Sequence, residues 1–409
     1  MIGVDAALEA VLSRAGRRGA LPIQQVTLDR ARGRILREAI AADRDMPPFA
    51  RSAMDGYAVR SADTAQAPVT LQVIEEIPAG RTPLHPVGPG QASKIMTGAP
   101  IPEGADAVQM VERTEPDGPD RVSIVKAVAP GENVRQAGED IRSGAGLIQP
   151  GAALDAAAVA LLAMTGRGVV AVSRRPRVAA IPTGDELVPV EETPDGPKIR
   201  ESNGQMIRVL AEAAGADADL FPIVPDLLED HEAAIATALE TADIVLLSGG
   251  VSMGDYDLVS RALLRLGCRA VFDRVAIQPG KPLWFGGTPD PSGPMIFGLP
   301  GNPVSSFVDF LVFVRPAIRA IAGASMTADR LVAARLEEAV HRRGGRRGYL
   351  PARLDTASGQ PVLRLVPTRG SADMVALSKA DALGIFSEDA EDFPAGAVVP
   401  ALPLEGLIG

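Results

Sequence analysis

The chain has 409 residues, 46% of them hydrophobic, so it is long enough for two to four domains and is not globally disordered. A net charge of −10 argues against general attraction to nucleic acid or to anionic lipid. Cys268 is the single cysteine, and the three histidines (His85, His231, His341) lack ligand spacing, which excludes a disulfide framework and disfavours a zinc enzyme.

The N-terminal segment "MIGVDAALEAVLSRAG" carries acids inside its apolar pattern and has no signal-peptide layout. The two most apolar stretches, 152–166 and 304–322, are interrupted by Asp155 and by Asp309 and Arg315. Neither stretch therefore reads as a membrane span, and we expect a soluble, cytoplasmic protein with no membrane partner.

The first half of the chain predicts helices around a β-rich module. Residues 3–15 and 27–41 have amphipathic helical patterns, and 154–166 is an alanine-rich helix closed by Gly166. Between 69 and 149, short strands separated by Gly and Pro indicate a compact β-rich module, with strands expected at 69–74, 91–95, 107–110 and 122–125. We assign 1–44 plus 147–175 to a helical linker domain and 45–146 to the β-rich module.

From residue 177 the pattern alternates between strands and helices. Strands "RVAAIP", "ADLFPIV", "DIVLLSGG" and "PMIFGLPG" are separated by helical segments, the first beginning at Asn203, read as its cap. This rhythm predicts a doubly wound parallel α/β domain over 176–326, with its site at the strand C-termini. Alternating segments over 327–409 predict a small C-terminal β-barrel or sandwich. The fold class is therefore multidomain α/β.

Five polar turns, each at the end of an apolar segment, carry candidate catalytic or binding residues. They place Asp55 in "SAMDGYAV", Thr97 in "IMTGAP", Asp140 in "AGEDI", Glu186 in "IPTGDELV" and Asp226 in "IVPD". The acids at strand ends of the α/β domain offer hard oxygen ligands for Mg²⁺ if their strands are neighbours. Taken singly, each turn has a plain structural reading: Asp-Gly in "MDGY" is foremost a tight turn, and Asp140 and Asp226 are solvated loop acids.

The segment "DIVLLSGGVSMGDYD" combines a buried strand, a glycine-rich end and two acids. Ser248, Gly249 and Gly250 allow backbone N–H groups to face an anion, whereas Asp255 and Asp257 add negative charge. Phosphate together with a divalent cation reconciles the two. The loop "GLPGNPVSSF" adds a helix start with Asn302 as cap and Pro303 in the first turn, and Lys281 adds a positive charge. "RRGGRR" (342–347) is either a solvated hairpin tip or a basic patch over an anionic ligand.

In their order along essentially the whole chain, "PPFARSAMDGYAV", "IMTGAPIPEGADAV", "GEDI", "PTGDEL", "SGGVSMGDYD", "PGKP" and "GLPGNPVS" resemble the molybdopterin molybdenumtransferase family (MoeA, and the gephyrin E domain). The resemblance implies an α/β domain of the molybdopterin-binding type. It also implies molybdate insertion into adenylylated molybdopterin, with Mg²⁺-dependent hydrolysis and release of AMP. The implied assembly is a homodimer whose active site is shared between subunits.

The resemblance also implies roles for individual residues. Catalytic roles fall on Asp55, Thr97, Asp140, Glu186, Asp226 and Asp255, of which Glu186, Asp226 and Asp255 are the implied metal ligands. The implied substrate-binding positions are Ser248, Gly249, Gly250, Ser252, Lys281, Pro282, Pro300, Pro303, Ser305, Arg369 and Ser371.

Three positions depart from the family pattern. Gln278 stands where many members have lysine, which leaves one cation fewer for the anion; the "GGVSMGDYD" loop is shorter than the "GE-x-DY" form; and Pro351 replaces a second basic residue of its strand.

Three alternatives to this function remain open. A molybdopterin adenylyltransferase resembles 177–326 but usually carries "GGTG" where this chain has "GGVS". A non-catalytic scaffold is disfavoured by the intact acids and the lack of a long linker. A tungstate-handling paralogue would have the same features, because the two oxyanions match in charge and nearly in size.

Overall fold

The computed structural model describes residues 1–250, 258–357 and 359–404. The chain forms two compact units. One comprises 39–149 and 160–168, and the other comprises 1–38, 150–159 and 169–409. Each is described by itself below.

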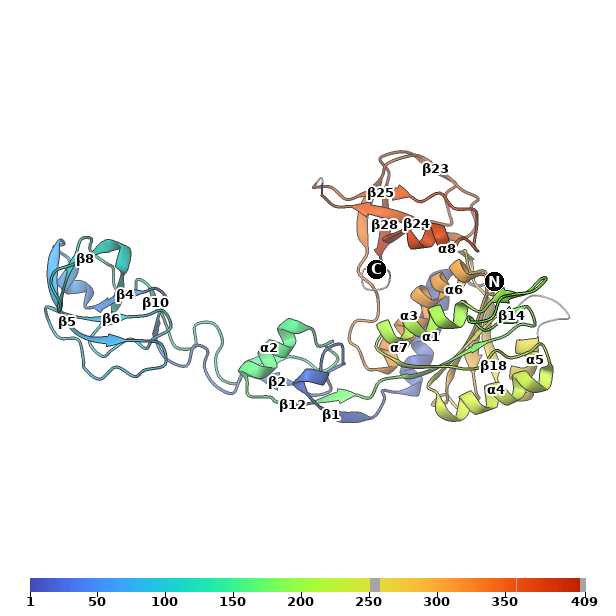
Figure 1. The fold of residues 1–409 in the computed structure, drawn as a ribbon, viewed down its shortest axis with the longest axis horizontal. Coiled ribbons are helices and arrows are strands. Elements are labelled where there is room, and N and C mark those ends of the chain that lie inside the picture. The colour runs from blue at the N-terminus through green and yellow to red at the C-terminus, as the bar shows by residue number, and fades with distance from the viewer. Residues whose placement is uncertain (251–257, 358, 405–409) are drawn as a thin grey trace. The chain divides into compact units, whose positions relative to one another are not determined.

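The unit built on 39–149 contains a six-stranded sheet with the order β7-β4-β6-β5-β9-β8 (Figure 1). Its strands are β4 (Gly56–Val59), β5 (Val69–Ile77), β6 (Gln91–Ile95), β7 (Ala107–Met110), β8 (Thr114–Pro116) and β9 (Arg121–Ile124). A strand occurs at each of the four predicted positions, so the β-rich module is confirmed. Two short strands, β3 (Arg51–Ser52) and β10 (Val134–Arg135), pair beside the sheet.

The predicted N-terminal helix exists as α1 (Val4–Arg18), but the helix predicted over 27–41 is wrong. A single 3-10 turn occupies Leu28–Arg30, and Gly33 has a left-handed φ of 74° that interrupts helical geometry. The flanking residues instead pair with distant strands. β1 (Ile23–Thr27) pairs with β12 (Val169–Ser173), and β2 (Ile40–Ala41) pairs with β11 (Gly146–Ile148). The alanine-rich helix is confirmed as α2 (Ala156–Met164).

The α/β domain has a six-stranded sheet with the order β16-β13-β17-β21-β20-β18. β13 (Arg177–Pro182) is parallel to β16 (Asp217–Leu220) and β17 (Ile244–Ser248), and β17 is parallel to β21 (Met295–Leu299). The expectation of a wholly parallel sheet is wrong for β20 (Pro282–Gly287), which runs antiparallel between β21 and β18 (Arg269–Arg274).

Alternate residues of β13 face opposite layers of this domain, because successive side chains point to opposite faces of a strand. Val178 and Ala180 pack with the layer of α1, α3 (Asn203–Ala213), α6 (Pro303–Asp309) and α7 (Arg315–Ile321). Ala179 and Ile181 pack with α4 (Leu228–Thr241) and α5 (Leu258–Arg265), seen below the sheet in Figure 1. A π-helical turn, Phe310–Val314, joins α6 to α7. The doubly wound architecture is therefore confirmed.

The C-terminal segment is a closed barrel, as expected, of β22 (Val332–Leu336), β24 (Arg347–Asp355), β25 (Val362–Leu365), β26 (Ala382–Phe386) and β28 (Val398–Pro403). Closure comes from pairing of β24 with both β25 and β26. β19 (Ile277–Gln278), which belongs to the α/β domain by sequence, pairs in parallel with β24. A loop of the α/β domain is thereby bound to the barrel.

No helix in the described part of the chain combines the length and apolar character needed to cross a bilayer. The four-domain boundaries stay a prediction.

Candidate functional site

Three loops that follow parallel strands meet at one edge of the α/β sheet. Thr183 follows β13, Ser248 ends β17, and Pro300 follows β21, and these strands are neighbours in the sheet. The Thr183 N–H donates to Ser248 O at 2.9 Å, and the Gly249 N–H donates to Leu299 O at 3.2 Å. The edge is the carboxyl end of the sheet, where open α/β folds place their ligands.

The two glycines after β17 are required by close contact and by backbone conformation. Gly249 and Gly250 have φ values of 95° and 66°, which only glycine adopts readily. A Cβ atom at Gly249 would lie 2.6 Å from Thr183 O, and one at Gly250 would lie 2.8 Å from Val259 Cγ2. The turn thus combines tight packing with left-handed backbone, a geometry suited to presenting N–H groups to an anion.

Asn203 ties two of these loops together, a role the sequence did not reveal. Its side-chain amide donates to Ser248 Oγ at 2.9 Å and to Gly301 O at 2.8 Å. The prediction that Asn203 caps its helix is wrong, because Ser202 occupies the cap position and Asn203 is the first helical residue. An asparagine at a helix start ordinarily signals a cap, so sequence reasoning had no signal for a contact between distant loops.

Glu186 and Asp226 lie exposed on two loops that are held together by Asp185. The Asp226 N–H donates to Asp185 Oδ1 at 3.0 Å, and the Asp185 N–H donates to Asp226 Oδ2 at 3.4 Å. The Glu186 carboxylate packs over Gly184, whose φ is 144° and where a Cβ would lie 2.3 Å from Glu186 Oε2. These are hard oxygen donors on adjacent loops, and Mg²⁺ in proteins binds through one or two carboxylates plus substrate phosphates. The donor chemistry fits the implied ion.

The described residues contain no group of three or more His, Cys, Asp or Glu arranged to hold a metal on their own. Asp255, the third implied ligand, and Ser252 of the phosphate loop lie outside the described residues. Their implied roles stay predictions.

The loop before α6 has the predicted proline-ordered form. Asn302 occupies the cap position without a side-chain capping bond, and Pro303 opens the helix. Ser305 is 4% exposed in the first turn, and the Ser306 hydroxyl donates to Pro300 O. Ser371 comes from the C-terminal segment, where its carbonyl accepts from the Val304 N–H at 3.1 Å. The structure therefore brings Ser371 to the start of this helix, and its implied substrate-binding role stays a prediction.

Arg369 lies close to Ser371 in the sequence and borders a cavity that Ser371 does not line. A cavity of about 540 Å³ is bordered by Arg369, Asp373 and Lys379 among others. The Arg369 N–H donates to Asp373 Oδ2 at 2.9 Å, and the same carboxylate caps α8 (Met374–Ser378) by accepting from the Ala376 N–H.

Lys281 and Pro282 follow a tight turn that packs on α6. Lys281 is exposed, and its carbonyl accepts from the Val275 N–H at 3.0 Å. Gly280 has a φ of 111°, and a Cβ there would lie 2.2 Å from Asp309 Oδ1. Asp309 is fully buried, and neither of its carboxyl oxygens has a hydrogen-bond partner among the described residues. Burial raises the pKa of Asp309 well above its usual range, which favours the protonated form of the side chain.

In the other unit, the structure joins Asp55 to Thr97. The Thr97 N–H and hydroxyl both donate to Asp55 Oδ1, each at 2.7 Å. Gly56 begins β4, and a Cβ there would lie 1.9 Å from Gln109 O. Close contact with the neighbouring strand therefore requires glycine at position 56, in addition to the tight turn that the sequence suggested.

Asp140 lies on a separate loop, where its N–H donates to Met46 O at 3.1 Å. Its Oδ1 lies 4.0 Å from Arg135 Nη1. No hydrogen bond within the described residues joins Asp140 to Asp55 or Thr97.

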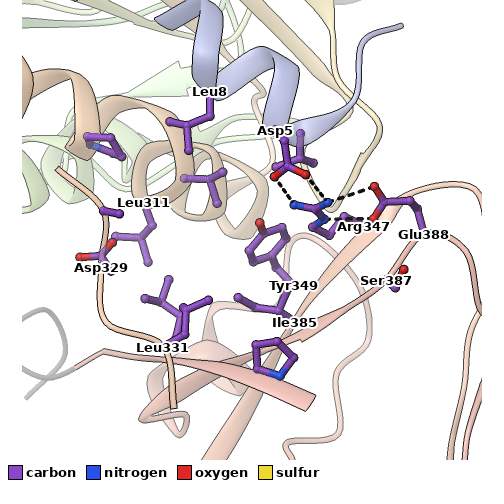
Figure 2. A pocket seen from close by; sticks show the side chains of 16 residues that line it. Asp5, Leu8, Leu311, Asp329, Leu331, Arg347, Tyr349, Ile385, Ser387 and Glu388 are labelled. Carbon is purple, nitrogen blue, oxygen red and sulfur yellow. Dashed lines mark hydrogen bonds and ion pairs between the residues drawn. The ribbon is translucent and has the colours of Figure 1, made fainter. Parts of the chain in front are cut away.

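A further cavity of about 410 Å³, lined mainly by apolar side chains, lies between α1, the π-helical turn and the barrel. Figure 2 shows Arg347 between Asp5 and Glu388 at one wall, with bonds of 2.6 and 2.8 Å to Asp5 and of 3.0 and 3.1 Å to Glu388. Hydrogen bonding to Arg347 lowers the pKa of both carboxyl groups. The arrangement pins α1 to the barrel, and none of the predicted site residues lines it.

Family models match almost the entire chain. The MoeA N-terminal region (domain I and II) matches 2–166, a probable molybdopterin binding domain matches 179–320, and the MoeA C-terminal region (domain IV) matches 333–404.

Individual relatives agree with the family models. A molybdopterin molybdenumtransferase from Nostoc sp. is 38% identical over 367 residues, covering 88% of this chain and 84% of the relative. One from Staphylococcus aureus is 32% identical over 401 residues, covering 97% and 95%. The solved molybdopterin biosynthesis moeA protein from Pyrococcus horikoshii has a TM-score of 0.84 and 31% identity, covering 98% of this chain and 100% of that one. The matching models, relatives and fold together establish that this chain belongs to the molybdopterin molybdenumtransferase (MoeA) family of enzymes.

Proposed function

We propose that this chain acts in molybdenum cofactor biosynthesis by inserting molybdate into adenylylated molybdopterin and hydrolysing the adenylate to release AMP. The reaction is Mg²⁺-dependent and takes place in the cytoplasm. The proposal goes beyond family membership, which by itself supports the coarser role in molybdenum cofactor biosynthesis.

One observation carries the proposal: an anion-binding turn and exposed carboxylates occur at the same sheet edge. The Thr183 N–H bond to Ser248 O connects the loop of the acids directly to the Ser248–Gly250 turn. Backbone N–H groups suit a phosphate, whereas carboxylates beside a phosphate are repulsive unless a cation lies between them. A phosphoanhydride with a divalent ion satisfies both groups.

Within this proposal each group has a defined task. Glu186 and Asp226, with Asp255, hold Mg²⁺, which when bound neutralises charge on the phosphoanhydride. The Ser248–Gly250 turn and the loop at Pro300 hold the phosphate and the pterin part of the substrate. Asn203 fixes the spacing of these two loops. Lys281 provides the positive charge for an oxyanion. Holding the reacting groups in a fixed geometry in this way supplies a large share of an enzyme's rate enhancement.

We further propose a homodimer whose active site combines both units from different subunits. Asp55, Thr97 and Asp140 belong to one unit, and Glu186 and Asp226 to the other. Helix α2 supports association: its nine residues are all apolar, yet Leu162 is its buried residue, and Met164 is 55% exposed. An apolar helix with so much exposed surface is typical of a face covered by another chain.

The test is AMP release by purified full-length protein supplied with adenylylated molybdopterin, with and without molybdate and Mg²⁺. Release that needs both, and that stops when EDTA removes the metal, is the expected result. Replacement of molybdate by tungstate in the same assay measures oxyanion preference. Tight substrate binding without any AMP release would overturn the proposal in favour of a carrier or scaffold. Consumption of ATP with unmodified molybdopterin would instead indicate an adenylyltransferase.

A further inference from the structure

The strongest feature that the proposed function leaves unused is Arg34, a buried arginine. It is 7% exposed and belongs to none of the ion pairs within residues 1–250, 258–357 and 359–404. Its guanidinium donates from Nη2 to Ser173 O at 2.7 Å. The Gln24 amide, with its oxygen turned toward Arg34, accepts from Nη2 as well and from Nη1 at 3.0 Å. Among the described residues these bonds use three of the five guanidinium donors, so the Nε proton and one Nη1 proton are left for another acceptor.

Arg34 borders a small hollow that adjoins a larger cavity. The hollow has a volume of about 30 Å³ and is also lined by Arg175 and Arg319. The cavity beside it has a volume of about 680 Å³. The two share six lining residues, namely Gly33, Ile35, Arg175, Ala214, Gly215 and Arg319. Arg34 and Arg175 therefore lie at one end of a space that is large enough for a small molecule.

The charges at this end of the space are not balanced. Burial and the neighbouring Arg175 lower the pKa of Arg34, and Asp217 raises it. Asp217 Oδ1 lies 3.9 Å from Arg175 Nη1, beyond hydrogen-bond distance. One carboxylate thus faces two guanidinium groups. A buried cation without a counter-ion is costly, so an anion bound in the hollow would offset that cost.

The acids that line the larger cavity do not supply this counter-ion. Asp329 is bonded to Arg315 and, at 2.7 Å, to Arg319, so its charge is already shared by two arginines. Glu212 is exposed to solvent. The rest of the cavity wall is mostly small or apolar and includes Ile35, Ala152, Ala153, Ala213, Ala324 and Met326. A ligand that fits the whole space therefore has an anionic group and a compact apolar body.

The cavity lies at the opposite end of the α/β sheet from the candidate functional site. Arg175 precedes β13 and Gly215 precedes β16, two parallel strands that begin at Arg177 and Asp217. Ser248 lies instead at the carboxyl end of its strand. None of the residues that line the hollow or the cavity is an implied catalytic or substrate-binding residue. This site is therefore independent of the proposed function.

We propose that this cavity binds a phosphate monoester, with Arg34 and Arg175 holding the phosphate group. The hollow beside Arg34 has about the volume of one water molecule, so it receives one phosphate oxygen. Another oxygen accepts from Arg175, and the organic substituent lies along the apolar wall. A phosphate monoester carries nearly two negative charges at neutral pH and therefore neutralises both arginines, whereas a carboxylate neutralises one.

The test is isothermal titration calorimetry of the purified full-length protein with phenyl phosphate, a phosphate monoester with a compact apolar body. We expect saturable binding. Phenol, which lacks the phosphate, should not bind measurably. Benzoate, which carries one charge, and inorganic phosphate, which lacks the apolar body, should each bind about 10-fold more weakly than phenyl phosphate. Benzoate that binds as tightly as phenyl phosphate would overturn the assignment of a phosphate.

Three variants locate the binding. Arg175→Met should weaken phenyl phosphate binding about 10- to 100-fold, the range of one lost hydrogen bond between charged groups. Ala214→Leu keeps every arginine but puts a larger side chain where the hollow and the cavity adjoin, and it should weaken binding about as much. Arg261→Met, an exposed arginine on α5, is the matched control and should bind within about twofold of the parent.

Lys281→Met separates this cavity from the sheet edge, where the proposed function also places a phosphate. Its phenyl phosphate binding should stay within about twofold of the parent, because distant sites are independent. Binding that is lost in Lys281→Met and kept in Arg175→Met would place the ligand at the sheet edge and overturn the inference. Absence of binding by the parent would overturn it too. Circular dichroism melting identifies any failure of Ala214→Leu to fold, and Arg175→Met, which changes a side chain that is 39% exposed, then decides the outcome.

Discussion

Thr97 donates both its backbone N–H and its hydroxyl to the same oxygen of Asp55, each over 2.7 Å. These bonds lower the pKa of Asp55, the backbone bond most strongly. The carboxylate is thereby kept ionised and in a fixed orientation in the β-rich unit. Because the pKa is lower in the folded state, the associated stability is present above the unfolded-state pKa and is lost as the pH falls through the folded-state pKa.

Removing the Thr97 hydroxyl should raise the pKa of Asp55 part of the way toward its ordinary value. Thr97→Val deletes the hydroxyl bond and keeps the backbone bond, whereas Thr97→Ser keeps both and is the control. Titration of the Asp55 carboxyl carbon by NMR measures the change. We expect the acidic limb of AMP release to move to higher pH by the same amount. An identical titration in the valine and serine variants would contradict this role for the hydroxyl.

Loss of the Asn203 side chain should loosen the spacing between the Ser248 and Gly301 loops. Asn203→Ala removes two hydrogen bonds of 2.9 and 2.8 Å, and we expect AMP release to fall about 10- to 100-fold. The neighbouring Ser202→Ala is the matched control, because Ser202 occupies the cap position without a side-chain capping bond. Similar rates in the two variants would show that Asn203 does not set the site geometry.

A shared site predicts complementation between inactive variants. Asp55→Asn and Glu186→Gln should each be inactive as homodimers. A one-to-one mixture, unfolded and refolded together, should regain about a quarter of the parent rate, because half the dimers are mixed and each holds one intact site. Light scattering confirms that the assemblies are dimers. A mixture as inactive as its components would place both residues in the same subunit's site or show that they never meet.

The buried Asp309 should limit stability at neutral and alkaline pH. An acid whose pKa is raised in the folded state lowers the free energy of unfolding as the pH rises above the ordinary value of 3.8. Asp309→Asn cannot ionise, so it should be more stable than the parent by about 1–3 kcal/mol at pH 8, with the difference shrinking toward pH 4.

Urea unfolding followed by circular dichroism across this pH range measures the difference. The exposed Asp219→Asn on β16 is the control and should show little change. A parent that is equally stable at pH 4 and pH 8, and no more sensitive to pH than the Asp309 variant, would contradict a raised pKa of the buried Asp309.

The local sequence pattern was enough to predict many of the strands and helices. Strands Gln91–Ile95 and Ala107–Met110 and the strand Arg177–Pro182 follow directly from apolar runs bounded by Gly and Pro. The doubly wound domain, the barrel and the glycine-rich turn after β17 were likewise predictable, because short-range periodicity and turn chemistry determine them. The order of motifs along the chain was also enough to indicate the family.

Pairing between distant segments decided the rest. The segment 27–41 has a helical pattern, yet Leu36 pairs with Val172 and Ile40–Ala41 pairs with Gly146–Ile148, and these pairings outweigh weak local propensity. Asn203 reads as a cap, but its amide reaches Ser248 and Gly301, 45 and 98 residues away. The contact of Arg342 with Gln278 spans 64 residues. Sequence spacing holds no information on which distant groups meet, because packing of whole elements brings them together; only the tertiary structure therefore placed these contacts.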